Sequence, residues 1–191
     1  MLIVGNRSTD RSPEIAVRDG ARVICEPRRG YGRALRTGLE KAQRFIIIFG
    51  DSDGTYDFSA LDSFYAPLCN GTADLVIGDR LNSLMEPEAM PWSHRWGVPF
   101  LSWCGRVKFG VPVHDFHCGL RGIRREAVER MSLRTDGMEF ATEMIAEAAR
   151  KKMRIPETPI KLSRPKYVRK EKLRTVRDGL RHLWFILKTH R

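Results

Sequence analysis

The segment FIIIFGDSDGTYD, residues 45–57, joins an uninterrupted apolar run to a cluster of carboxylates. Consecutive apolar residues of this length predict a strand buried on both faces. Open α/β sheets bind ligands beyond the carboxyl ends of their strands, so we expect Asp51 and Asp53 to lie at a binding site. Their spacing suits a hard divalent cation such as Mg²⁺ or Mn²⁺. The alternative is an acidic turn in which Asp51 or Asp53 caps neighbouring backbone amides.

The rest of the chain alternates short apolar runs with segments of helical spacing. This alternation predicts an α/β fold with a mostly parallel sheet covered by helices on both faces. The expected strands are residues 2–4, 23–25, 45–49, 73–78 and 155–162. A helix is expected to start at 13–16, and others to cover 34–42, 98–107, 126–131 and 138–152, with a loop at 82–92.

Composition excludes several classes of protein. The chain has 191 residues, 42% of them hydrophobic, which is enough for one domain with a buried core and too many for a disordered chain. The longest apolar run is far shorter than the roughly 20 residues of a membrane-spanning helix, and no secretory signal is visible. A cytosolic location follows. The four cysteines are predicted to be free thiols that pack as small buried hydrophobes.

The positive charge is concentrated in the last 41 residues. Residues 151–191 hold 14 basic and three acidic side chains, a difference of +11 that equals the net charge of the whole chain. We therefore divide the chain into a domain at 1–163 and a basic amphipathic tail at 164–191. Apolar residues recur there at helical spacing: Leu173, Val176, Leu180, Leu183, Trp184 and Leu187. The basic residues beside them are Arg169, Lys170, Lys172, Arg174, Arg177 and Arg181.

Such a tail can bind an anionic membrane surface. Its apolar stripe can equally pack on the domain's own core. A basic segment also attracts nucleic acid, but no nucleic-acid motif accompanies it and aromatic residues are not interleaved with the charge, so no nucleic-acid partner is expected.

Six sequence blocks, taken together and in this order, resemble the family-2 glycosyltransferases that act on polyprenyl phosphates. This group includes the dolichol-phosphate mannosyltransferases and the polyprenyl-phosphate glucosyltransferases. The similarity extends over nearly the whole chain. The blocks are STD (8–10), RGYGRALR (29–36), GDSDGTYD (50–57), VIGDR (76–80), DFHCGLR (115–121) and GMEFATEM (137–144).

The resemblance implies a GT-A fold and an inverting transfer of a sugar from a nucleotide diphosphate to a polyprenyl phosphate, dolichyl or undecaprenyl, at the cytoplasmic face of the membrane. Asp51 and Asp53 match the motif that binds the metal and the nucleotide diphosphate. Arg80 and Arg121 match basic positions near the acceptor phosphate; the alternative for each is a structural ion pair or a solvated surface charge. Asp115 matches an acidic site position, with a helix or turn cap as its alternative. The residues expected to act in catalysis are Asp53, Asp115 and Arg121.

The same resemblance assigns a set of residues to the nucleotide sugar. Glycines in the RGYGR block can let the backbone approach the nucleotide, although a lone G-x-G is more often a turn. The expected nucleotide-sugar contacts are Asn6, Asp10, Gly30, Gly32, Arg33, Asp51, Ser52 and Asp53.

The chain departs from the family pattern at its start. Family members open with an additional strand of the Val-Ile-Pro type, whereas this sequence begins at what the resemblance expects to be the second strand. Two alternatives follow: a start that lies upstream, or a degraded copy of the family domain. Gly5 replaces the aspartate expected to contact the nucleoside, and Thr55 stands where the dolichyl-mannose group often has Gln. A non-catalytic remnant that binds a membrane or a partner through its basic tail is therefore the alternative function.

Two smaller clusters leave alternatives open. His114, Asp115, His117 and Cys118 have residue types that bind zinc, but the family segment favours acceptor-site architecture. Glu139 and Glu143 are one helical turn apart and face either the site or solvent.

Overall fold

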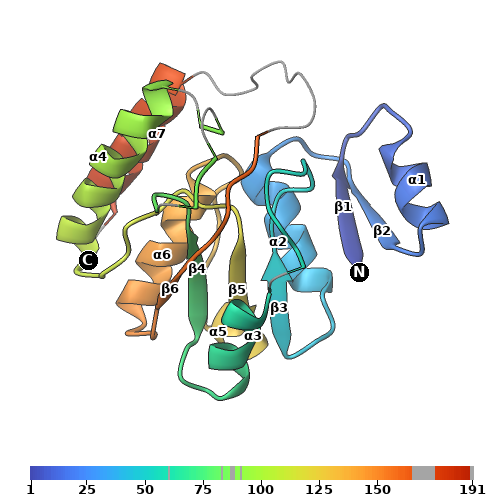
Figure 1. Cartoon of the computed structure of the whole chain (residues 1–191), viewed down its shortest axis with the longest axis horizontal. Coiled ribbons are helices and arrows are strands. Elements are labelled where there is room, and N and C mark those ends of the chain that lie inside the picture. The colour runs from blue at the N-terminus through green and yellow to red at the C-terminus, as the bar shows by residue number, and fades with distance from the viewer. Residues whose placement is uncertain (60, 83, 87–88, 91, 165–174, 190–191) are drawn as a thin grey trace.

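The apolar run at residues 45–49 forms an edge strand of a four-stranded sheet in the computed structural model of the chain (Figure 1). The structure describes residues 1–59, 61–82, 84–86, 89–90, 92–164 and 175–189. The strands are β1 (Leu2–Asn6), β2 (Arg22–Glu26), β3 (Ile46–Phe49), β4 (Leu75–Asp79), β5 (Arg121–Arg124) and β6 (Glu157–Pro159). The helices are α1 (Ser12–Arg18), α2 (Tyr31–Lys41), α3 (Asp62–Cys69), α4 (Trp92–Phe109), α5 (Arg125–Arg130), α6 (Phe140–Arg150) and α7 (Thr175–Lys188).

In the four-stranded sheet, β3, β4 and β6 run in one direction, as expected of a mostly parallel sheet, and β5 runs against them. Its strand order is β3-β5-β4-β6, and β5 runs antiparallel to both β3 and β4, while β4 and β6 are parallel. β1 and β2 form a separate parallel pair. Among the described strands, β1 and β2 therefore form no hydrogen-bonded ladder with the four-stranded sheet.

Burial differs between the two apolar strands. Ile47 is buried, but the other β3 residues are only half-buried, and Phe45 before the strand is 85% exposed. The prediction that residues 45–49 are buried on both faces is wrong because β3 lies at the edge of its sheet. β4 and β5, which lie inside the sheet, have buried residues on both faces.

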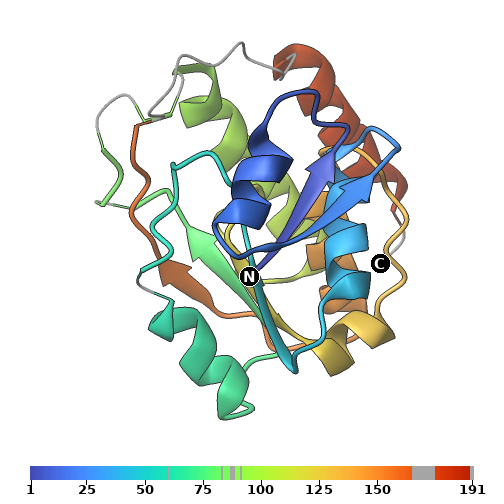
Figure 2. The ribbon, with the colours of Figure 1, turned by 90° about the vertical axis from the view of Figure 1, so that its right-hand side faces the viewer.

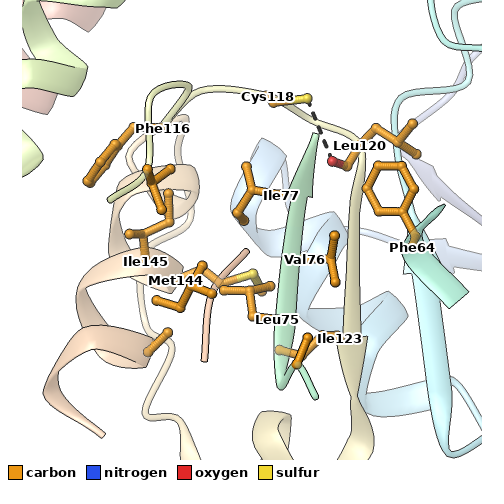
Figure 3. Close-up of a cluster of buried hydrophobic side chains, with 14 of the residues drawn as sticks. Phe64, Leu75, Val76, Ile77, Phe116, Cys118, Leu120, Ile123, Met144 and Ile145 are labelled. Atoms are coloured by element: carbon orange, nitrogen blue, oxygen red, sulfur yellow. Dashed lines mark hydrogen bonds between the residues drawn. The ribbon is translucent and has the colours of Figure 1, made fainter. Parts of the chain in front are cut away.

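The core forms on both faces of β4 (Figure 3). Leu75 and Ile77 point to one face, where Met144 of α6 lies, and Val76 points to the other face, on the side of Phe64 in α3. Strand alternation places these side chains on opposite faces. The core thus fixes the end of β4, from which the next loop leaves.

α4 and α7 lie side by side beyond α6, at the end of the molecule opposite β1, β2 and α1 (Figures 1 and 2). Both helices contact α6 as well as each other. Within the described part of the chain, every helix is too short or too polar to cross a lipid bilayer.

Several element boundaries differ from the sequence predictions. α4 begins at Trp92, the last residue of the predicted loop and six residues before the predicted helix at 98–107, because Gly97 is a poor helix former. α2 begins at Tyr31, inside the predicted glycine loop. β6 covers only residues 157–159 of the predicted 155–162. β5 was not predicted at all, because its sequence RGIR lacks an apolar pattern.

The four cysteines are free, as predicted, but they are not all buried. Cys118 is buried and Cys104 is half-buried, whereas Cys25 and Cys69 are exposed. Cys25 lies on the outer face of the two-stranded sheet, and Cys69 ends α3. The small, apolar character of cysteine therefore does not predict which of the four are buried.

Two glycines of α4 predict opposite effects of the same substitution. A Cβ atom at Gly105 would lie 2.5 Å from the buried Phe116 ring, so Gly105→Ala should destabilise the fold by about 1–3 kcal/mol. A Cβ atom at Gly97 would meet nothing within 4 Å, so Gly97→Ala should stabilise by about 0.5–1 kcal/mol through helix propensity. Urea denaturation of both variants measures the difference; equal effects would contradict the packing of α4 on Phe116.

Candidate active site

The two carboxylates predicted at the end of β3 lie on a structured turn. Asp53 Oδ1 accepts hydrogen bonds from the Thr55 backbone N at 3.0 Å and from Thr55 Oγ1 at 2.5 Å. One oxygen of Asp53 therefore caps the turn, as the alternative interpretation expected. Both carboxylates are half-buried.

A second loop, residues 115–121, lies directly against this turn. A Cβ atom at Gly119 would lie 2.6 Å from Asp51 Oδ2, so a larger residue at this position would force the Asp51 carboxylate to move. The Gly119 backbone N also donates to the Tyr56 hydroxyl at 2.9 Å. These contacts place the DFHCGLR block beside the GDSDGTYD block.

The 115–121 loop also holds a buried ion pair at the end of β4. Arg80 Nε donates to Asp115 Oδ2 at 2.7 Å, and Arg80 Nη2 donates to Asp115 Oδ1 at 2.8 Å. Burial would by itself raise the pKa of Asp115, but the Arg80 charge and its hydrogen bonds outweigh it and lower that pKa below the ordinary value. Asp115 is therefore an ionised carboxylate that orients the Arg80 guanidinium.

Arg121 has surroundings unlike those expected of a residue that binds an acceptor phosphate. Its side chain is 2% exposed, and its guanidinium donates to three backbone carbonyls. Nε bonds Cys118 O at 2.9 Å, Nη1 bonds Ala141 O at 2.8 Å and Nη2 bonds Phe116 O at 2.8 Å. Arg121 thus ties the 115–121 loop to the start of α6.

Two tyrosines that the sequence analysis did not single out belong to this site. Burial, followed by the charge of Asp51, raises the pKa of Tyr31 far above its ordinary value. Burial is also the main cause of the raised pKa of Tyr56. Both hydroxyls lie within electrostatic range of Asp51 and Arg80, so both stay protonated beside the carboxylates. Tyr31 lies in the RGYGRALR block and Tyr56 in the GDSDGTYD block, and membership of these blocks is the one sequence feature that indicates them.

The residues predicted to contact the nucleotide near β1 and β2 make contacts within the protein. Asn6 Nδ2 donates to Arg28 O at 2.6 Å, and Asn6 Oδ1 accepts from Gly30 N at 3.0 Å. Asp10 accepts from Ser12 N at 3.0 Å near the start of α1. Ser52 is exposed in the turn after β3. Asn6 therefore fixes the loop that precedes α2.

Gly30 and Gly32 allow the backbone of α2 to approach another backbone segment of the protein closely, whereas the sequence predicted an approach to a nucleotide. A Cβ atom at Gly30 would lie 2.3 Å from Asp136 O, and one at Gly32 would lie 2.6 Å from Thr135 O. Gly30 also has a φ of +150°, which side-chain-bearing residues rarely adopt. These glycines dock α2 on residues 135–137, which precede α6.

A buried glutamate missed by the sequence analysis organises the same region. Glu26 ends β2, is 5% exposed and accepts from Thr37 Oγ1 at 2.7 Å. It also pairs with Arg33 at 3.4 Å and with Arg28 at 3.5 Å. Nothing in the sequence marks it, because a single Glu after a strand carries no pattern.

The residues considered for zinc have separate partners. His114 Nδ1 lies 2.8 Å from Glu157 Oε2, and Cys118 Sγ contacts Leu120 O. Burial, then the neighbouring His182, lowers the pKa of His117 well below its usual value. No group of three metal-ligating side chains occurs among the described residues. These four residues therefore do not converge on one ion.

Glu139 and Glu143 each bind a different partner within the protein. Glu143 is buried and accepts from the backbone N of Arg134 at 2.8 Å and of Thr135 at 3.0 Å. Glu139 pairs with Arg181 of α7 at 3.1 Å.

The carboxylates of Asp51 and Asp53, on the turn after β3, fit a divalent cation whose remaining ligands come from a bound phosphate compound and water. Among the described side chains, Asp51 and Asp53 belong to no cluster of three potential ligands. Mg²⁺ is commonly held by one or two carboxylates while substrate phosphates and water complete its shell. A pair of carboxylates on a partly open turn matches that chemistry.

A cavity of about 490 Å³ adjoins the ion pair. It is lined by Asp79, Leu81 and His114 from the loops around Arg80 and Asp115. The other wall comes from Pro99, Trp103 and Arg106 of α4. A ligand in this cavity would lie between the candidate site and α4.

Arg121 provides a test of the loop's architecture. Arg121→Met should destabilise the fold by about 3 kcal/mol or more, because three buried carbonyls lose their donor. Arg124→Met, in the same strand, removes a pair with the exposed Glu126 and should cost less than about 1 kcal/mol. Chemical denaturation measures both variants; similar losses would show that the three hydrogen bonds do not hold the loop.

Comparison with known proteins identifies the family. Residues 1–132 match Glycosyl transferase family 2. The chain is 40% identical over 190 residues to the low-salt glycan biosynthesis hexosyltransferase Agl6 of Haloferax volcanii, covering 97% of this chain and 45% of that protein. It is 33% identical over 153 residues to the dolichyl-phosphate hexose transferase of the same organism, covering 80% of this chain and 65% of that one. The chain thus spans about half to two thirds of these relatives.

The fold comparison agrees. Glucosyl-3-phosphoglycerate synthase from Mycobacterium tuberculosis, in complex with Mn²⁺ and UDP-glucose, superposes with a TM-score of 0.76 at 18% identity, covering 97% of this chain and 67% of that one. The expected GT-A fold is confirmed. By its sequence match and its fold, the chain belongs to glycosyl transferase family 2.

Proposed function

We propose that the chain transfers a sugar from a nucleoside diphosphate sugar to a polyprenyl phosphate, dolichyl or undecaprenyl, with inversion at the anomeric carbon. The observation that carries the proposal is the contact between the Asp51 turn and the 115–121 loop at Gly119. This contact sets a pair of carboxylates beside the buried Arg80–Asp115 pair. A site with these two halves suits a donor diphosphate on one side and an acceptor phosphate on the other.

Asp51 and Asp53 form the donor half. They would hold Mg²⁺ or Mn²⁺ against the diphosphate, and the metal would neutralise the charge that develops on the leaving group. Thr55 fixes one Asp53 oxygen, so the turn keeps its shape without ligand. Asn6, Asp10, Gly30, Gly32, Arg33 and Ser52 belong to the proposed nucleotide side.

Arg80 forms the acceptor half. Its guanidinium has five N–H groups, and the Asp115 side chain takes two of them. The remaining groups are assigned to the acceptor phosphate, which arginine binds well in a bidentate manner. Asp115 and Arg121 act as positioning residues in this proposal: the first orients Arg80, and the second holds the loop that carries Asp115.

The proposed reaction is a single displacement. An oxygen of the acceptor phosphate attacks the anomeric carbon, a new C–O bond forms, and the bond to the nucleoside diphosphate breaks with its electron pair going to the diphosphate. The acceptor phosphate is already ionised near neutral pH, so no side chain needs to remove a proton. Positioning and charge neutralisation then supply most of the rate enhancement.

The similarity to a dolichyl-phosphate hexose transferase supports a lipid phosphate as acceptor. We place the reaction at the cytoplasmic face of a membrane, where the basic tail would add electrostatic attraction. Its residues 165–174 lie outside the described part of the chain. In the described part of α7, His182 and Ile186 are buried against the domain, whereas Leu180, Trp184 and Leu187 are exposed.

The experiment follows transfer of radiolabelled sugar from UDP- and GDP-sugars to polyprenyl phosphate in detergent with Mn²⁺. Asp53→Asn should lower the rate by about 10²-fold or more, because it removes a charge from the donor half. Asp57→Asn is the matched control, since Asp57 is exposed in the same segment and accepts its hydrogen bonds from Ser59, and its rate should stay within twofold.

EDTA should abolish the wild-type activity. Equal rates for Asp53→Asn and Asp57→Asn, or transfer that persists in EDTA, would contradict the assigned donor half. Circular dichroism of both variants verifies that they are folded.

A further inference from the structure

All four tryptophans of the chain lie on α4 and α7 and point to solvent. Trp92, Trp96, Trp103 and Trp184 are 54–71% exposed. Tryptophan is on average a highly buried residue, so this exposure is unusual. The indole ring is enriched where one part of a surface is apolar and another is wet. These side chains therefore indicate a surface that meets another phase or molecule.

On α4 the exposed apolar residues form one stripe. At 3.6 residues per turn, they fall within an arc of about 80°. The face opposite the stripe is the one that packs on the domain: Ser102 Oγ accepts from Phe116 N at 3.1 Å, and Gly105 lies against the Phe116 ring. The stripe is thus separate from the packing face. It consists of Trp92, Trp96, Phe100, Trp103 and Val107.

α7 repeats this division. His182 and Ile186 are buried, whereas Leu180, Trp184 and Leu187 are exposed. α4 and α7 contact each other and both contact α6, so the two helices form one layer (Figure 1), and the exposed residues of each helix lie away from its buried ones. We call the eight exposed apolar residues of the two helices the tryptophan face.

Basic side chains border the tryptophan face. On α4, Arg95 and Arg106 lie on one side of the stripe and Lys108 on the other, and the α4 sequence holds no acidic residue. On α7, Arg181 is exposed, and Lys188 Nζ lies 4.5 Å from the centre of the Trp184 ring. The α7 sequence holds one acidic residue, Asp178, beside the basic residues Arg177, Arg181 and Lys188. A surface of this charge complements an anionic partner.

We propose that the tryptophan face binds the headgroup region of an anionic lipid bilayer. Aromatic rings flanked by Lys and Arg match the boundary between acyl chains and anionic headgroups. The tryptophan face extends along two adjacent helices and does not gather in one pocket. This shape suits a planar lipid surface better than the compact hot spot of a protein partner. The surface differs from the basic tail expected from the sequence, because α4 supplies most of it.

The cavity beside Arg80 would then also connect the bilayer surface with the candidate site. Trp103 and Arg106 border or belong to the tryptophan face and also line that cavity, together with Asp79 next to Arg80. A lipid whose phosphate reaches the candidate site would thus pass from the bilayer along α4. This step rests on the proposed function, whereas binding of the bilayer does not.

The test adds vesicles to the full 191-residue chain without any sugar donor. The vesicles contain 30% phosphatidylglycerol in phosphatidylcholine, and pure phosphatidylcholine vesicles serve for comparison. Because every tryptophan lies on the tryptophan face, intrinsic fluorescence reports directly on it. We expect a blue shift and co-sedimentation with the anionic vesicles, and weaker binding to the neutral ones.

A matched pair of variants localises the binding. The double variant Trp96→Ser/Phe100→Ser should bind anionic vesicles more than tenfold more weakly. Phe45→Ser removes a ring that is 85% exposed just before β3, a strand that lies away from α4 and α7, and this variant should bind as the wild type does. All three positions are exposed, so neither variant opens a core cavity.

Three results would overturn the proposal: no shift with anionic vesicles, equal loss in both variants, or a blue shift without lipid that accompanies dimer formation in sedimentation. The last would assign the face to a second copy of the chain. Vesicle binding without sugar transfer would support the tryptophan face while the proposed function fails. Transfer to a short, water-soluble polyprenyl phosphate without vesicle binding would support the function and overturn the face.

Discussion

The buried guanidinium of Arg121 is the interaction on which the candidate site depends. It gathers the carbonyls of Phe116, Cys118 and Ala141 and so joins the 115–121 loop to the start of α6. An arginine can do this because its planar fork offers several donors in fixed directions. The loop then carries Asp115 to Arg80 and Gly119 to Asp51. Without this constraint, the 115–121 loop would not be held in contact with both the carboxylate turn after β3 and the arginine after β4.

The remaining elements follow from this arrangement. β4 is buried on both faces, and α3 and α6 cover it, so the loop that begins with Arg80 leaves from a rigid strand. Gly30 and Gly32 bring α2 against residues 135–137, and this places Tyr31 near Asp51. On the far side of α6, α4 and α7 form a layer with one packed and one exposed face. The proposed donor half, the proposed acceptor half and the tryptophan face therefore follow one another across this family-2 glycosyltransferase chain.

The sequence predicted the GT-A fold and most elements, because long apolar runs and ordered motif blocks are strong signals. It misjudged β3, since edge and interior strands read alike, and it missed β5, whose arginines and glycine resemble a loop. The residues predicted for the site from the motif blocks lie on neighbouring loops, and their roles stay proposals: Asp51, Asp53, Arg80 and Asp115. Arg121 was assigned to a phosphate because a sequence shows a charge without showing the carbonyls around it. Tyr31, Tyr56, Glu26 and the α4 stripe depend on contacts between distant segments, which no local pattern encodes.

The acceptor class is the central claim, and a comparison of acceptors tests it most directly. The chain would be supplied with Mn²⁺ and a panel of UDP- and GDP-sugars, together with polyprenyl phosphate, the corresponding polyprenol or 3-phosphoglycerate. The account predicts a sugar-phosphate-lipid product from polyprenyl phosphate and none from the other two acceptors. Transfer to 3-phosphoglycerate alone, or equal transfer to polyprenol and polyprenyl phosphate, would contradict a site built around Arg80 for a lipid phosphate.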